Sequence, residues 1–134
     1  MLRLAQEREQ LTVIDDQFGA PTGADLLVDV TAYAILHLTH LTHQPQATGL
    51  YQLAAAGETS WKGYARLVLA HAKRLKPELN IKATEVKAVP SSAFVTAAVR
   101  PHNSRLNKSQ LQDTFELQMP RWDQGVQRML AEIL

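Results

Sequence analysis

The sequence predicts an α/β fold in which helices alternate with a few short strands. Apolar residues recur at helical spacing in several long segments, short apolar runs lie between them, and glycine or proline stands at most junctions. A few short strands make a poor sheet. We therefore expect outer strands of a larger sheet whose centre lies elsewhere, so that residues 1–134 form a single region of a longer protein. The initial methionine keeps a free-standing chain open as the alternative.

The chain begins with a predicted helix over residues 1–9 and a strand over 11–15, an apolar run that is partly β-branched. Gly19 and Pro21 interrupt this run, so residues 16–22 are predicted to be a loop. Such a strand-to-helix loop is where α/β proteins usually hold a ligand, near helix N–H groups that favour anions.

A long helix is expected over 23–43, because one face is apolar. Thr22 stands where its N-cap belongs, and Asp25 would complete a capping-box-like pair. The remaining predicted elements are a strand over 50–54, a helix over 60–75 capped by Thr59 or Ser60, a strand over 81–86, an irregular segment over 87–106, and helices over 108–115 and 121–133.

Composition excludes several functional classes. The chain has 134 residues, is 46% hydrophobic and carries a formal net charge of +1, which gives no reason to expect a nucleic-acid or acidic membrane partner. It has no cysteine, so disulfides and thiolate metal sites are excluded and a reducing cytoplasm is the simplest compartment. No apolar run of about 18 residues exists to span a bilayer.

The loop after the first strand is the first candidate site. Gln17 can donate and accept hydrogen bonds, as reading a base edge or a sugar hydroxyl requires, and Gly19 lets the backbone approach a ligand closely. The alternative is a plain turn in which Asp15 and Asp16 are solvated and Thr22 is a cap. We favour capping for Thr22 with Asp25, and a site for the loop as a whole.

The second candidate is the segment from Arg100 to Asn107, where Pro101 favours an extended or turned backbone. Guanidinium groups at Arg100 and Arg105 could grip a diphosphate, although two surface arginines in a solvated loop are the commoner arrangement. Their replacement by alanine is predicted to weaken binding of a diphosphate by about tenfold each.

Histidines and aromatic residues give weaker signals. His37, His40 and His43 could approach one another on a helix, but we expect them to be solvated rather than bound to a metal. Aromatic residues at helical spacing are usually core, and Trp61, at a helix start, is the one that could form a pocket wall. The sequence contains neither a glycine-rich nucleotide loop nor an obvious catalytic set.

Taken together, three motifs resemble one family. They are Val13-Ile14-Asp15-Asp16-Gln17-Phe18-Gly19-Ala20-Pro21-Thr22, then Gly49-Leu50-Tyr51-Gln52-Leu53 followed by Trp61, then Arg100-Pro101-His102-Asn103-Ser104-Arg105-Leu106-Asn107. Their order and the final helix resemble the C-terminal part of dTDP-4-dehydrorhamnose reductase, an extended short-chain dehydrogenase/reductase. The resemblance implies a cytoplasmic enzyme that uses NADPH or NADH and forms dTDP-L-rhamnose for cell-surface polysaccharide such as O-antigen.

The resemblance also implies that the catalytic machinery lies outside this chain. The family uses a Tyr-x-x-x-Lys pair, whereas Tyr33, Tyr51 and Tyr64 are followed four residues on by His37, Ala55 and Val68. With the Rossmann cofactor loop also missing, the chain corresponds to the substrate-binding part, and alone it is expected to be inactive.

Residues carried over from the family would form the nucleotide-sugar pocket: Gln17, Gly19, Pro21, Thr22, Arg100, Asn103, Ser104 and Arg105, with Trp61 as a weaker candidate. Asp25 and Glu132 match positions where some members bind Mg²⁺ at a dimer interface, and a third carboxylate would come from the missing part. We expect a homodimer or a swapped assembly. A non-catalytic interaction domain of the same superfamily and a free-standing binding module are the alternatives.

Overall fold

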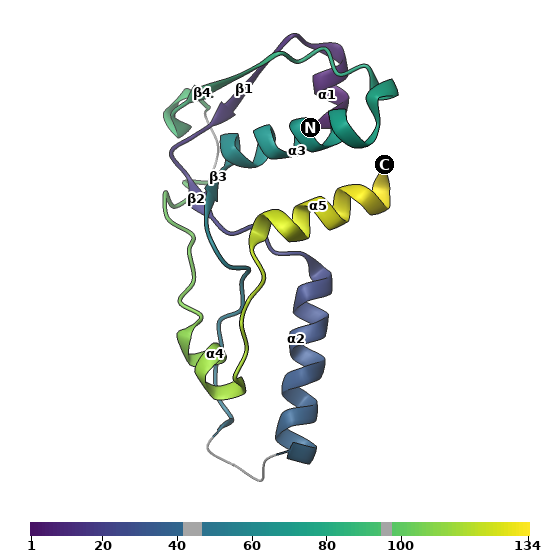
Figure 1. Cartoon of the computed structure of the whole chain (residues 1–134). Helices are drawn as coiled ribbons and strands as arrows, with labels where there is room; N and C mark the ends of the chain where they lie inside the picture. The colour runs from purple at the N-terminus through teal and green to yellow at the C-terminus, as the bar shows by residue number, and fades with distance from the viewer. Residues whose placement is uncertain (42–46, 95–97) are drawn as a thin grey trace.

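The computed structural model describes residues 1–41, 47–94 and 98–134, except for the side chains of residues 40 and 41. It is an elongated arrangement of helices with two small pairs of strands (Figure 1). The mixed α/β prediction is confirmed. In order along the chain, the elements are α1 (Leu2–Glu7), β1 (Gln10–Ile14), β2 (Phe18–Gly19), α2 (Ala24–Leu36), η1 (His37–Leu41), β3 (Thr59–Ser60), α3 (Trp61–Leu75), η3 (Pro77–Leu79), β4 (Glu85–Val89), η4 (Ser91–Ala93), α4 (Ser109–Phe115) and α5 (Trp122–Ile133).

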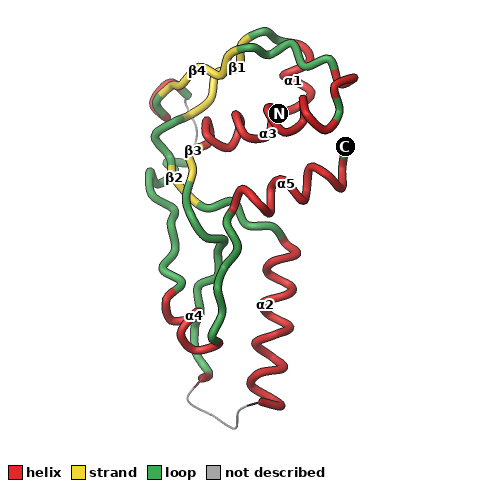
Figure 2. The backbone as a smooth tube through the Cα atoms, viewed as in Figure 1, coloured by secondary structure: helices red, strands yellow, loops and turns green. Residues whose placement is uncertain are grey.

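Two separate pairings make up the strands. β1 lies parallel to β4, with Gln10 opposite Glu85 and Ile14 opposite Val89. β2 lies antiparallel to β3, with Phe18 opposite Ser60. Figure 2 shows how little of the backbone is strand and how long the connecting loops are. Parallel strands normally belong to larger sheets that are buried on both faces. A sheet of only two parallel strands, β1 and β4, therefore agrees with the expectation that these are outer strands of a larger sheet.

The buried apolar residues form three small clusters instead of one core. One joins α3 to α5 through Val68, Trp122 and Leu130, and a second lies among α1, β1 and α3 around Ala5 and Leu69. The third, between α2 and α4, consists of Val30, Leu111, Phe115 and Met119. Figure 1 shows the corresponding separation: α2 and α4 extend away from the end of the molecule that holds α1, α3, β1 and β4.

Two predicted strands differ from the structure. Residues 50–54 are extended but form no regular strand, because Tyr51 and Leu53 pack onto the α2–α4 cluster. The predicted strand over 81–86 begins later, at Glu85, because the amides of Ala83 and Thr84 donate to the carbonyls of Ala5 and Glu9. Tertiary contacts with α1 thus replace the first part of the strand.

The predicted helices are found with shifted ends. Ser60 caps α3 as expected, since its hydroxyl accepts the Gly63 amide at 3.1 Å. Gly57 turns the chain before it at a φ of 77°, and an added Cβ there would lie 3.2 Å from the Trp122 ring. The helix predicted over 23–43 is α2 followed by one π-helical turn, and its last two residues lie outside the described ranges. Among the described residues, no helix combines the length and apolarity that crossing a membrane requires.

Candidate functional site

The short strand β2 lies between two segments that are far from it in sequence. On one side, Phe18 and Gly19 pair with Ser60 and Thr59 of β3. On the other side, the Phe18 amide donates to the His102 carbonyl at 2.8 Å, and the Ser104 amide donates to the Phe18 carbonyl at 2.8 Å. β2 therefore joins three stretches of the chain at one place.

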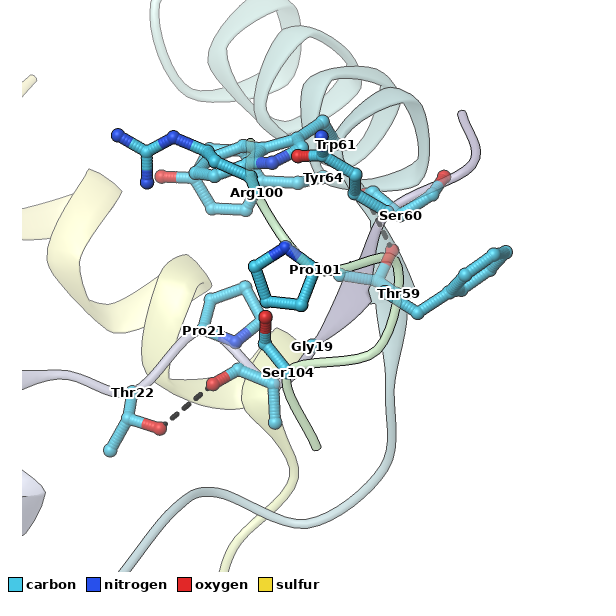
Figure 3. Close-up of a pocket in the computed structure, with 13 residues that line it drawn as sticks. Gly19, Pro21, Thr22, Thr59, Ser60, Trp61, Tyr64, Arg100, Pro101 and Ser104 are labelled. Carbon is cyan, nitrogen blue, oxygen red and sulfur yellow. Dashed lines mark hydrogen bonds between the residues drawn. The ribbon is translucent and has the colours of Figure 1, made fainter. Parts of the chain in front are cut away.

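A cavity of about 470 Å³ lies at this junction, a volume in the range of small-molecule sites. Figure 3 shows Trp61, Tyr64 and Arg100 on one side of the view, with Pro21, Thr22 and Ser104 on the other. The residues that line it are Gln17, Phe18, Gly19, Ala20, Pro21, Thr22, Thr59, Ser60, Trp61, Tyr64, Arg100, Pro101 and Ser104. We call this cavity the β2 pocket.

Seven of the nine predicted substrate residues line the β2 pocket. They are Gln17, Gly19, Pro21, Thr22, Trp61, Arg100 and Ser104. Asn103 and Arg105 lie beside it but are not part of the lining. The Arg105 guanidinium pairs with Glu58 and also donates from Nε to the Asn103 side-chain oxygen at 2.9 Å. The structure therefore does not place Arg105 with Arg100 in the manner that a shared diphosphate grip would require.

Among the described residues that line the β2 pocket, Arg100 is the one that carries a charge. Its side chain makes no hydrogen bond or ion pair with any residue in the described part of the chain. Lys62 nearby is neutralised by Asp15, and Arg105 by Glu58. An unpaired guanidinium at the edge of a cavity is suited to a carboxylate or phosphate ligand, which it can bind with two parallel hydrogen bonds.

Trp61 is a pocket wall and not part of the apolar core. Its side chain is 51% exposed, and its ring meets the Tyr64 ring edge-on with centroids 6.2 Å apart. Trp61 therefore departs from the core position that is usual for aromatic residues at helical spacing, and its position agrees with the expected role as a pocket wall. Trp122, by contrast, is buried against Val68 and Val126.

Asp15 connects the end of β1 to the start of α3. Its carboxylate accepts a hydrogen bond from the Ser60 hydroxyl and an ion pair from Lys62 Nζ at 3.1 Å. The Ser60 hydrogen bond, followed by Lys62, lowers the pKa of Asp15, although partial desolvation opposes the shift. The alternative of a plain turn with a solvated Asp15 does not describe this residue, since its carboxylate binds Ser60 and Lys62 at the start of α3.

Asp16 connects the same loop to the segment after β4. Its carboxylate accepts the Ser91 amide at 2.9 and 3.0 Å and the Ser91 hydroxyl at 2.9 Å. His102 Nδ1 lies 3.6 Å from this carboxylate and donates to the Asp16 carbonyl at 2.8 Å. The Ser91 amide is the main reason that the pKa of Asp16 is lowered. Asp16 is therefore a second carboxylate with hydrogen-bond partners in the fold, in contrast to the alternative of a plain turn.

Thr22 is not the helix cap that the sequence predicts. α2 begins at Ala24 with Gly23 as its N-cap. The Thr22 hydroxyl instead donates to the Ala20 carbonyl at 2.9 Å and accepts the Ala55 amide at 3.1 Å. The Thr22 hydroxyl thus bonds to the Ala55 amide instead of capping α2. This hydrogen bond connects the pocket loop to the segment before β3. Sequence reasoning missed this link because Ala55 carries no local signal.

The predicted metal residues lie on two helices, Asp25 on α2 and Glu132 on α5. Asp25 pairs with Arg128, and Glu132 lies further along α5. Across residues 1–41, 47–94 and 98–134, no group of three or more His, Asp or Glu side chains is placed to hold a metal ion. His37 packs between Tyr33 and Phe115, with ring centroids 5.8 and 5.6 Å away, so it is not a solvated histidine. His43 and the side chain of His40 lie outside what the structure describes.

A smaller cavity of about 260 Å³, which we call the α2–α5 cleft, lies between the N-terminal ends of these helices. It shares Pro21 with the β2 pocket. Its acids and arginines are Asp25, Asp29, Arg121 and Arg128, and both arginines have acidic partners: Arg128 pairs with Asp25, and Arg121 Nε lies 3.0 Å from Asp123.

Comparison with known proteins identifies the family. The sequence pattern of the RmlD substrate binding domain matches residues 1–134. The chain belongs to the RmlD substrate binding domain family. As such a domain, it is 51% identical over 99% of its length to dTDP-4-dehydrorhamnose reductase of Shigella flexneri, and 50% identical to that of Salmonella typhimurium. The resemblance stated from the motifs is confirmed.

Solved structures agree with this family assignment. A dTDP-4-dehydrorhamnose reductase from Bacillus anthracis, in complex with NADP, superposes on this RmlD substrate binding domain with a TM-score of 0.76 at 30% identity. That comparison covers 98% of this chain and 41% of the other. The chain likewise spans 43% of the length of its Shigella and Salmonella relatives. Its relatives are therefore more than twice as long.

Proposed function

We propose that this chain is the substrate-binding part of an NAD(P)H-dependent dTDP-4-dehydrorhamnose reductase, and that the β2 pocket holds part of its dTDP-sugar. The observation that supports this most directly is the unpaired Arg100 guanidinium in a cavity whose other lining residues are uncharged. A nucleotide sugar supplies the diphosphate that such a cation would bind. Identity of 51% to a reductase across almost the whole chain supports the same substrate class.

Other residues that line the β2 pocket would also contact the dTDP-sugar. Gln17 offers an amide that can pair with a base or sugar hydroxyl, and Ser104 adds a hydroxyl. Trp61 gives an exposed aromatic surface for the base or sugar ring. We keep Asn103 and Arg105 as predicted contributors that act from beside the pocket, since Asn103 already accepts two hydrogen bonds from Arg105.

We place the nicotinamide-cofactor site outside this chain, whose sequence has no glycine-rich nucleotide loop. In Rossmann domains a glycine-rich turn brings the pyrophosphate to a helix N-terminus, but α2 has Asp25 in its first turn, where the carboxylate would repel a phosphate. The part of the relatives that has no counterpart here would supply the cofactor site, as well as the tyrosine and lysine that the family uses. The domain assignment of residues 1–134, a cytoplasmic location and a product used for O-antigen belong to the same proposal.

The proposal can be tested by joining this chain to the N-terminal part of the Shigella flexneri reductase. We expect the joined protein to oxidise NADPH when dTDP-4-dehydrorhamnose is added, and the chain alone not to do so. The intact Shigella protein is the control. A joined protein that binds NADPH and dTDP but reduces nothing would contradict the proposal and favour the non-catalytic interaction domain.

Homodimer formation and Mg²⁺ binding stay predictions. Support for assembly comes from α2, where Leu27, Val28 and Ile35 are exposed although they are large and apolar. Light scattering that shows a monomer over a wide range of concentrations would contradict the dimer. A Mg²⁺ site that uses Asp25 would have to compete with Arg128 and recruit carboxylates beyond those described.

A further inference from the structure

The β2 pocket has two walls that differ in sequence position. The Trp61 wall consists of residues 59–64, and the Arg100 wall of residues 100–104. Each pairs with β2, but a strand of two residues offers few backbone hydrogen bonds to fix either wall. The aspartates that end the preceding strand supply additional connections.

We propose that Asp15 and Asp16 are positioning residues, and that Asp15 fixes the Trp61 wall while Asp16 independently fixes the Arg100 wall. Neither carboxylate lines the pocket, so both act through other residues. The two aspartates follow β1, and their carboxylates bind different parts of the fold: Asp15 binds Ser60, and Asp16 binds Ser91. The inference rests on the proposed function, since it assigns how the ligand-binding groups are held in place.

Asp15 acts on the Trp61 wall through Ser60. The Ser60 hydroxyl donates its hydrogen to the carboxylate, so its lone pair is directed to the Gly63 amide, which it accepts at 3.1 Å. Lys62, the residue after Trp61, binds the same carboxylate, and its Nζ lies 3.1 Å from the Asp15 oxygen. Trp61 is therefore held between two residues that both bind Asp15.

Asp16 acts on the Arg100 wall through Ser91 and His102. Three hydrogen bonds attach Ser91 to its carboxylate, and His102 Nδ1 lies 3.6 Å from the same carboxylate; the hydrogen bond from His102 to the Asp16 carbonyl does not depend on the side chain. Ser91 precedes the wall in the chain and His102 is part of it. Arg100, which has no described partner of its own, thus depends on these neighbours for its place.

Residue-specific amide hydrogen exchange on the full chain tests this without any ligand. Asp15→Ala should raise the exchange rate at Gly63 about fivefold and leave that at Ser104 unchanged, because Ser60 and Lys62 lose their shared partner. Asp16→Ala should raise the exchange rate at Ser104 about fivefold and leave that at Gly63 unchanged, because the contacts of its carboxylate with Ser91 and His102 are lost. Asp113→Ala, an exposed carboxylate on α4, is the control and should change neither amide. If both substitutions loosen both walls equally, or if neither changes either amide, the inference is wrong.

Asp15→Asn and Asp16→Asn keep one oxygen acceptor and serve if an alanine variant fails to fold; they should show the same selectivity to a smaller degree. A second measurement uses dTDP and thymidine as probes. Asp16→Ala should weaken dTDP binding about fivefold and leave thymidine binding unchanged, because only dTDP carries the diphosphate assigned to Arg100. If the wild-type chain does not bind dTDP, the proposed function fails, whereas the exchange pattern still decides the positioning roles.

Discussion

The β2 pocket and the α2–α5 cleft are neighbouring cavities that share Pro21, yet their charges are arranged differently. In the larger β2 pocket the single charged lining residue, Arg100, has no described partner. In the smaller cleft both arginines have acidic partners. A guanidinium without a partner in the fold can form charge-assisted hydrogen bonds with an anionic ligand. A guanidinium that already pairs with a carboxylate of the fold is less available for this. This difference, more than cavity size, is the reason for proposing the β2 pocket as the binding site.

Replacing Arg100 tests the comparison most strongly. Arg100→Ala should weaken dTDP binding by tenfold or more, because loss of charge-assisted hydrogen bonds costs about 1.5–3 kcal/mol. Calorimetric titration measures the change. Arg105→Ala is the matched control, and we expect a smaller loss than the tenfold that the sequence suggested, since Arg105 is already paired with Glu58. Equal affinities for wild type and Arg100→Ala would break the comparison.

Thr22 lies at the boundary of the two cavities and should affect both. Thr22→Val keeps the shape of the side chain but leaves the Ala55 amide without its acceptor, and Ala55 is only 3% exposed. We expect the free energy of unfolding to fall by about 1–3 kcal/mol, the cost of an unsatisfied buried donor. Urea denaturation measures it, with Thr12→Val on the exposed side of β1 as the control. Equal losses in the two variants would argue against a special role for Thr22.

The sequence predicts the elements better than it predicts the links between them. Local patterns predict Ser60 as a possible cap and a helix over 121–133, and the structure has both, with the helix beginning one residue later. Thr22 was misassigned and the partner of Asp15 was not foreseen, because Ala55 and Ser60 are remote in sequence from them. A hydroxyl or carboxylate beside a helix start has an obvious local use, and only the folded chain shows which competing donor it meets.

The same reasoning explains why most, but not all, of the predicted substrate residues line the β2 pocket. Residues grouped by motif, such as Gln17 and Gly19, reach the pocket because a short loop delivers neighbours together. Tyr64 and Thr59 were not assigned to the site, although their position beside Trp61 at a helix start was a usable signal. Arg105 was assigned from its closeness to Arg100 in the chain, yet Glu58, from another segment, removes it from the lining.

Acid should weaken the β2 pocket by protonating the two aspartates that hold its walls. Hydrogen bonds lower the pKa of both Asp15 and Asp16 in the folded chain below their ordinary value of 3.8. Their stabilising contribution is therefore complete above about pH 4 and is lost as the pH falls through the folded pKa. The difference in thermal midpoint between wild type and Asp16→Ala should stay constant from pH 7 to 5 and shrink below about pH 4. A difference that already changes between pH 7 and 5 would point to another titrating group.

The smallest effect is expected in the α2–α5 cleft. Arg128→Ala should lower the free energy of unfolding by less than about 1 kcal/mol and leave dTDP binding unchanged, because the Asp25 and Arg128 side chains are 44% and 55% exposed and water screens the pair. The same variant sharpens the magnesium question, since it frees the Asp25 carboxylate from its cationic partner. A thermal midpoint that rises with Mg²⁺ in Arg128→Ala, but not when Asp25 is also replaced by alanine, would make the cleft a latent cation site. A thermal midpoint that does not change with Mg²⁺ would mean that the charged residues of the cleft only stabilise the fold, and that ligand binding depends on Arg100.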